Sequence, residues 1–131
     1  MKKVIFVLGS EVDKNHAAKI QKKLAELKIE NELFVASAHK NPRKVLEILE
    51  KYESEKEIVF VTIAGRSNAL SGFCAGNSRH PVLACPPFSD KIDFLVNINS
   101  TLQMPSKVPV MTVLDPENCA LAAARILKND E

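Results

Sequence analysis

Short apolar runs alternate along the chain with longer stretches whose apolar residues recur every three or four positions, and this alternation restricts the fold more than any other feature. The runs 3–8 and 58–63 are rich in β-branched and aromatic residues and lack a polar alternation, which is typical of strands buried on both faces. After the first run, apolar residues up to Leu27 line one face of a helix. Strands that alternate with helices imply right-handed crossovers and a three-layer α/β/α sandwich around a parallel sheet.

The same alternation continues to the end of the chain. Pro42 suits the first turn of a helix, where its missing N–H is not needed. The expected strands are 3–8, 32–36, 58–63, 81–85 and 110–114, and the expected helices are about 14–27, 42–52, 69–76, 92–98 and 116–127.

Composition excludes several classes of protein. The chain has 131 residues and a formal charge of only +2, which predicts one domain and gives no reason to expect binding to nucleic acid or to a membrane surface. No apolar run approaches the roughly 20 residues that cross a bilayer, so we expect a cytoplasmic protein. The three cysteines form no Cys-x-x-Cys pair and are expected to be packing residues, not a disulfide framework or a zinc site.

The loops that follow the strands are the candidate sites, because ligands of such sheets bind beyond the carboxyl ends of the strands. The first loop contains Gly9, Ser10 and Asp13 at the start of a helix, where free N–H groups attract anions. A hydroxyl can donate to a phosphate, and a carboxylate can accept from sugar hydroxyls. The loop has neither a Walker sequence nor a dinucleotide fingerprint, and a simple helix cap is the alternative for this loop alone.

The second loop places Ser37, His39 and Lys40 within four residues at a strand end. Histidine is the side chain best matched to proton transfer near neutral pH, and the neighbouring lysine suits an anion. We therefore select His39 as the candidate catalytic residue. His16 and His80 are expected to be structural.

The third loop contains Gly65, Arg66, Ser67 and Asn68. A guanidinium, a hydroxyl and an amide in a row suit a carboxylate or a phosphate, and arginine can bind either with two hydrogen bonds. The alternative is a polar turn whose arginine is merely solvated.

The three loops form part of a series of motifs that runs along the chain. These motifs are Gly9-Ser10 with Asp13, Ser37-Ala38-His39-Lys40, Ile63-Ala64-Gly65, Gln103-Met104-Pro105, Val108-Pro109-Val110 and the alanine-rich stretch after Asn118. In their order and spacing the sequence resembles the aminoimidazole ribonucleotide (AIR) carboxylase and mutase family of de novo purine synthesis, nearly from end to end. The resemblance implies a flavodoxin-like fold, a single domain over 1–131, a homo-octamer whose sites combine several subunits, and a C-terminal helix at about 116–128 that packs on a neighbouring subunit.

Within the family the chain resembles the class II carboxylases, which use carbon dioxide itself. Lys40 stands where the mutase class has arginine, Arg66 lies in a third loop that differs between the classes, and Ala69 takes the place of a second histidine. The resemblance implies a reversible carboxylation of AIR at C4, which gives 4-carboxy-AIR (CAIR) and needs no ATP, metal or other cofactor.

The resemblance also implies a role for each candidate residue. His39 would transfer the C4 proton, Asp13 would bind the ribose hydroxyls, and Ser10, Ser37 and Lys40 would bind the phosphate. The residues at the end where carbon dioxide and the carboxylate lie would be Gly65, Arg66, Ser67 and Asn68.

Two other functions stay open. The nearest is the mutase reaction on the same fold, in which the N-carboxylated nucleotide (N5-CAIR) is converted to CAIR. A non-enzymatic flavodoxin-like module is more remote. A phospho-receiver would need an aspartate where Ile63-Ala64-Gly65 stands, and a flavin carrier would need stacking aromatics, whereas the chain has no tryptophan and one tyrosine, Tyr52.

Overall fold

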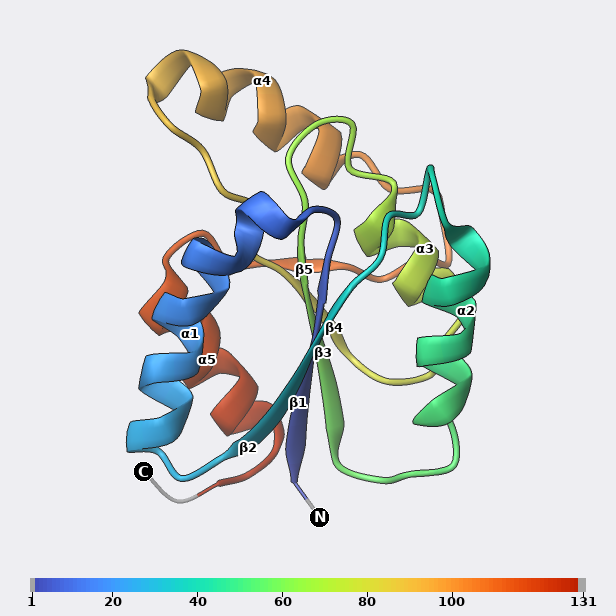
Figure 1. Cartoon of the computed structure of the whole chain (residues 1–131), viewed down its shortest axis with the longest axis vertical. Coiled ribbons are helices and arrows are strands. Elements are labelled where there is room, and N and C mark those ends of the chain that lie inside the picture. The colour runs from blue at the N-terminus through green and yellow to red at the C-terminus, as the bar shows by residue number, and fades with distance from the viewer. Residues whose placement is uncertain (1, 130–131) are drawn as a thin grey trace.

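The computed structural model describes residues 2–129, which form a five-stranded parallel sheet with helices on both faces (Figure 1). The strands are β1 (Lys3–Leu8), β2 (Glu30–Val35), β3 (Ile58–Ile63), β4 (Val82–Ala84) and β5 (Met111–Thr112). The helices are α1 (Lys14–Glu26), α2 (Pro42–Lys51), α3 (Leu70–Gly76), α4 (Lys91–Leu102) and α5 (Pro116–Ile126), with a short 3-10 turn, η1 (Glu11–Asp13), before α1. The predicted three-layer α/β/α sandwich is confirmed.

The strand order is β2-β1-β3-β4-β5, the flavodoxin-like order, in which the sequence of strands reverses between β1 and β3. The register keeps the carboxyl ends of three strands level, because Leu8 pairs with Val35 on one side and with Ile63 on the other. The loops after β1, β2 and β3 therefore begin side by side.

The apolar runs of the sequence are buried on both faces, as their composition predicts. On one face Val4, Phe6 and Leu8 of β1 pack under α1 and α5, which also contact each other. On the other face Ile5 and Val7 pack under α2 and α3. Figure 1 shows these two helical layers on opposite sides of the sheet.

Three strands differ from the predicted boundaries. Strand β4 is shorter than 81–85, although the flanking backbone still bonds to β3 through Phe60 N–H to the Pro81 carbonyl at 2.9 Å and Cys85 N–H to the Thr62 carbonyl at 3.0 Å. Strand β5 has only two residues at the edge of the sheet. Strand β2 begins two residues before the predicted start and ends one residue sooner.

Helix α4 is longer than the predicted 92–98 and lies outside both helical layers, beyond the carboxyl ends of the strands (Figure 1). It starts at Lys91 because the Asp90 carboxylate accepts from the Asp93 backbone N–H. Its apolar side chains Ile92, Leu95 and Val96 are exposed. Within residues 2–129, no helix is both long and apolar enough to cross a membrane.

Candidate functional site

Loops from three strands and the helix starts that follow them meet at the point where the strand order reverses. They enclose a cavity of about 290 Å³. Eight of the nine candidate residues line it: Ser10, Asp13, Ser37, His39, Lys40, Gly65, Arg66 and Ser67, together with Gly9, Ala38, Ala64 and Leu70.

The first loop brings a hydroxyl and a carboxylate to this cavity. Ser10 caps η1, and its Oγ accepts from the Val12 N–H at 3.4 Å. Asp13 is 8% exposed, and burial raises the pKa of its carboxyl, an effect opposed by the Ser10 hydrogen bond and by the charge of His16. A largely buried carboxylate of this kind is suited to accept hydrogen bonds from hydroxyls.

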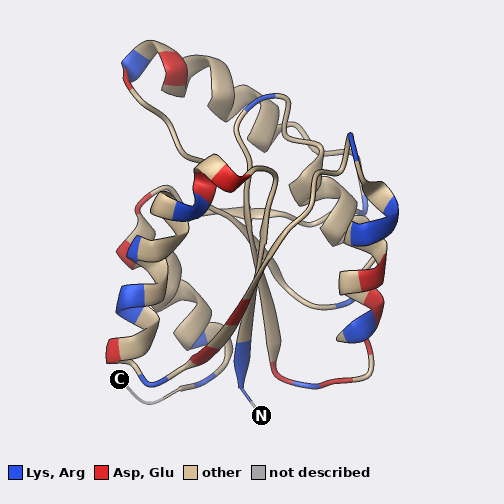
Figure 2. Ribbon diagram, viewed as in Figure 1, with Lys and Arg blue, Asp and Glu red and all other residues tan. Residues whose placement is uncertain are grey.

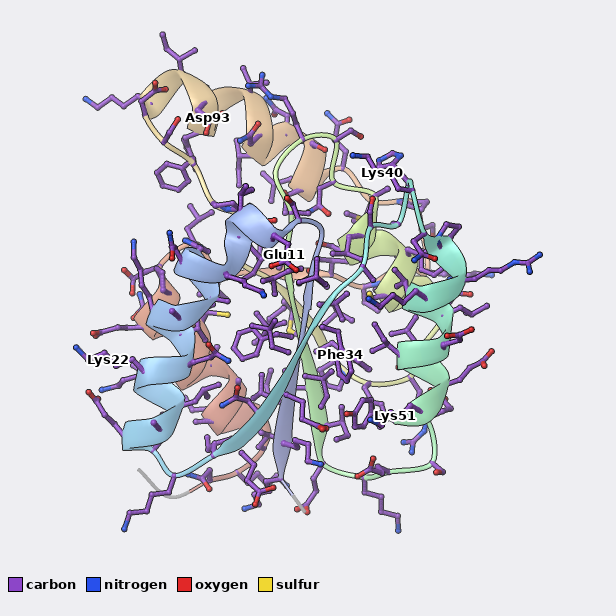
Figure 3. All side chains as sticks on the ribbon, viewed as in Figure 1. Glu11, Lys22, Phe34, Lys40, Lys51 and Asp93 are labelled. Carbon is purple, nitrogen blue, oxygen red and sulfur yellow. The ribbon has the colours of Figure 1, made fainter. Side chains whose placement is uncertain are left out.

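The second loop is held in shape by its own side chains. The Ser37 hydroxyl accepts from the Lys40 N–H at 3.2 Å, and the Asn41 side chain caps α2 by accepting from the Lys44 N–H. This short turn leaves the side chains of His39 and Lys40 exposed at the mouth of the cavity. Figure 3 labels Lys40 at the tip of the loop, on the side of the sheet where the strands end.

His39 reaches across to the third loop. Its Nε2 lies 3.2 Å from the Ser67 carbonyl oxygen. Because a carbonyl only accepts, this contact favours the tautomer with the proton on Nε2. The other ring nitrogen, Nδ1, is then the one that can accept a proton.

Arg66 in the third loop pairs with α4. Its Nη2 lies 3.4 Å from Oδ1 of Asp93, so one edge of the guanidinium is engaged while its other donors stay available.

Asn68, predicted in the same site, lies elsewhere: it does not line the cavity and is 5% exposed. Its Nδ2 donates to Ser71 Oγ at 2.8 Å and to Thr101 Oγ1 at 3.1 Å, and its Oδ1 accepts from the Ser71 N–H at 3.1 Å. Its own backbone N–H donates to Ser100 Oγ. The sequence shows a polar residue in a loop, but it does not show that polar residues of α4 are its partners.

Sequence reasoning did not select the α4 residues that lie beside this site. Asp93 and Asn97 line a second cavity of about 450 Å³, which shares Gly65 and Arg66 with the first. The only local signal in the sequence was the capping pattern at Asp90. The order of the strands does not indicate that a helix far along the chain folds over the third loop.

A larger cavity, of about 690 Å³, lies between α1 and the start of α5, where its lining includes His16, Lys19 and Asp115. It contains none of the nine candidate residues, and it is not at the strand-order reversal. We therefore take the smaller cavity as the site.

His80 and the three cysteines are buried, as expected for structural residues. His80 is buried, with Nε2 2.7 Å from the Tyr52 carbonyl oxygen, and all three cysteines are buried and free. Cys85 has a polar neighbour, since its Sγ lies 3.5 Å from His16 Nε2. Among the side chains of residues 2–129, no group of three His, Cys, Asp or Glu could hold a metal ion.

Comparison with known proteins agrees with this fold. A family model described as AIR carboxylase matches residues 3–131. The chain is 51% identical over 124 residues to the phosphoribosylaminoimidazole carboxylase of Archaeoglobus fulgidus, and the match covers 95% of this chain and 68% of that protein. It is 41% identical over 126 residues to the Homo sapiens bifunctional phosphoribosylaminoimidazole carboxylase/phosphoribosylaminoimidazole succinocarboxamide synthetase, and this match covers 95% of this chain and 29% of that protein.

Among solved structures, the crystal structure of Treponema denticola PurE superimposes with a TM-score of 0.93 at 42% sequence identity, and the match covers 100% of this chain and 83% of that one. The resemblance inferred from the sequence motifs is thereby confirmed. The chain belongs to the AIR carboxylase family.

Proposed function

We propose that this AIR carboxylase, a carboxy-lyase of purine biosynthesis, adds carbon dioxide directly to C4 of AIR in a reversible reaction that consumes no ATP. The observation that carries the proposal is the position of His39: it lines the cavity at the strand-order reversal together with residues suited to a phosphate and residues suited to a carboxylate.

The nucleotide end of the substrate fits the first two loops. Lys40 supplies a cation, and Ser10 and Ser37 supply hydroxyls, all within the lining of one cavity. Asp13 accepts hydrogen bonds from the ribose hydroxyls. Binding the phosphate and ribose at fixed points orients the imidazole ring toward the third loop.

The chemistry at C4 needs a base. The 5-amino group donates electron density into the ring, so that C4 attacks the carbon of carbon dioxide and a C–C bond forms. The adduct then loses its C4 proton to His39 Nδ1, and the ring electrons are restored. In the reverse direction the imidazolium returns this proton to C4 as carbon dioxide leaves.

The charge that develops on the new carboxylate is stabilised by Arg66, whose guanidinium keeps free donors beyond its contact with Asp93. Carbon dioxide itself is small and uncharged and offers little to bind. The site therefore acts mainly on the carboxylate as it forms.

Direct use of carbon dioxide, as opposed to the mutase reaction, is supported by the residues that distinguish the classes. Lys40, Arg66 and Ala69 are the residues of the second and third loops that resemble the class II enzymes and differ from the mutases.

We also propose that the enzyme is a cytoplasmic homo-oligomer, an octamer in the form that the family resemblance implies. In one chain the His39 and Lys40 side chains are exposed, and so is the apolar face of α4. Figure 2 shows that α4 carries charge only at its first residues, whereas α1 and α2 carry charges along their length. We expect α4 and the helix at about 116–128 to contact neighbouring subunits, and native mass spectrometry measures the number of chains directly.

The role of His39 is tested by His39→Asn, followed by decarboxylation of CAIR in deuterated water. The wild type should release AIR that carries deuterium at C4. The variant should lose at least about 100-fold in kcat, within the range for removal of a general acid–base group, while the dissociation constant for AIR changes little. A variant that turns over normally would exclude His39 as the proton carrier.

A further inference from the structure

Asp93 of α4 lies against the one guanidinium of the site, although no strand loop contains it. Its Oδ1 is 3.4 Å from Arg66 Nη2. Figure 3 labels Asp93 on α4, above the carboxyl ends of the strands. The cavity that contains Asp93 shares Gly65 and Arg66 with the substrate cavity, so the pair lies at the border between the two.

The carboxylate of Asp93 is itself fixed by several donors. Oδ2 accepts from the Ser89 N–H at 2.8 Å and from the Ser89 hydroxyl at 3.3 Å, and Oδ1 accepts from Asn97 Nδ2 at 3.1 Å. The Ser89 backbone hydrogen bond is the main reason that the pKa of this carboxyl lies below its usual range. Asp93 therefore presents a fixed negative charge, held by α4 and by the loop before it.

Arg66 has no comparable support of its own. Its side chain is 59% exposed, whereas that of Asp93 is 22% exposed. A long exposed side chain samples many rotamers, and holding it in one of them before the ligand arrives reduces the entropy lost on binding.

We propose that Asp93 is a positioning residue of the carboxylation site, which holds the Arg66 guanidinium so that its free donors face the carboxylate formed at C4. This inference rests on the proposed function, because it assigns Arg66 to the carboxylate end of AIR. It adds α4 to the site, and it gives Asn97 and Ser89 a function: they fix the group that fixes the arginine.

The inference distinguishes two classes of ligand. A contact with Arg66 raises the affinity for CAIR, which carries the carboxylate, and the rate of the step that forms this group. It does not change the affinity for AIR, which has no carboxylate. Removal of Asp93 should therefore weaken CAIR binding and lower turnover while AIR binding stays the same.

The test compares Asp93→Asn with Asp90→Asn, in the assembled enzyme. Both variants remove one negative charge from the start of α4, but asparagine caps a helix as well as aspartate does, so Asp90→Asn is the matched control. We expect Asp93→Asn to lose roughly tenfold in kcat/KM for CAIR decarboxylation, since a misplaced group costs this much or more. The control should stay within about twofold, and the dissociation constant for AIR should be unchanged in both variants.

A double-mutant cycle with Arg66→Ala separates positioning from a general effect on the fold. If Asp93 acts through Arg66, adding Asp93→Asn to Arg66→Ala gives little further loss. A loss that is additive in the double variant, or a single variant with wild-type kcat/KM, would overturn the inference. Failure of the proposed function gives a different result, because the wild type itself would then form no CAIR from AIR and bicarbonate.

Discussion

A substitution at Asn68, inside the third loop, tests whether the hydrogen bonds of this residue fix the loop in place. Asn68→Ala removes an amide that bridges α3 and α4 through Ser71 and Thr101. Two buried groups lose the partner that Asn68 supplied, the Ser71 N–H and the Thr101 hydroxyl, while Ser71 Oγ keeps its contact with Thr62 Oγ1 at 2.7 Å. At about 1–3 kcal/mol for each buried group left unsatisfied, we expect a loss of about 2–6 kcal/mol in the free energy of unfolding.

The assay is denaturant unfolding at a fixed protein concentration, together with kcat/KM for CAIR. Asn77→Ala is the matched control, because Asn77 is exposed and its Nδ2 makes one hydrogen bond, to the Phe73 carbonyl at 2.8 Å. We expect this control to change stability by no more than about 0.5 kcal/mol, as is usual for surface substitutions. If Asn68→Ala is as stable as the control, the network does not hold the loop and the reasoning fails.

Two further predictions concern titratable groups. Asp13→Asn should raise stability at neutral pH, because burial raises the pKa of this carboxyl in the folded protein and the wild type therefore loses stability as the pH rises from the ordinary pKa of an aspartate to the raised one. Well below the ordinary pKa the carboxyl is protonated in the folded and in the unfolded chain, and the variant should make no difference. The same variant should raise KM for AIR, and unfolding curves at the two pH values with steady-state kinetics measure both effects. Cys119→Ala should raise the pKa of Cys85, because a hydrogen bond from Cys119, followed by the nearby His16, lowers that pKa to about 6. Thiolate ultraviolet absorbance follows this titration without interference from Cys74, whose pKa burial raises to about 12, and an unchanged Cys85 titration would contradict the assigned cause.

Most of the fold could be predicted from local pattern. The runs 3–8 and 58–63 are strands with the predicted bounds, because a strand buried on both faces needs an unbroken apolar run. Pro42 and Asn41 mark the start of α2, where the proline occupies the first turn and the asparagine caps it.

The C-terminal end of α4 could not be predicted from the sequence, because the packing of apolar side chains is not what fixes the second half of this helix. Ser100 and Thr101 are bound to Asn68 across the fold, by contacts between residues more than 30 positions apart. For the same reason the sequence indicated the loops of the site but not the support that α4 gives to Arg66 and Asn68.

The most direct measurement supplies the purified enzyme with AIR and bicarbonate in one reaction and with freshly prepared N5-CAIR in another, both without ATP, and follows the initial rate of CAIR formation. Direct carboxylation predicts that CAIR forms from AIR at a rate that rises with dissolved carbon dioxide, and that N5-CAIR yields CAIR only after it has decayed to AIR. Immediate conversion of N5-CAIR, with no CAIR formed from AIR and bicarbonate, would contradict direct carboxylation and identify the enzyme as a mutase.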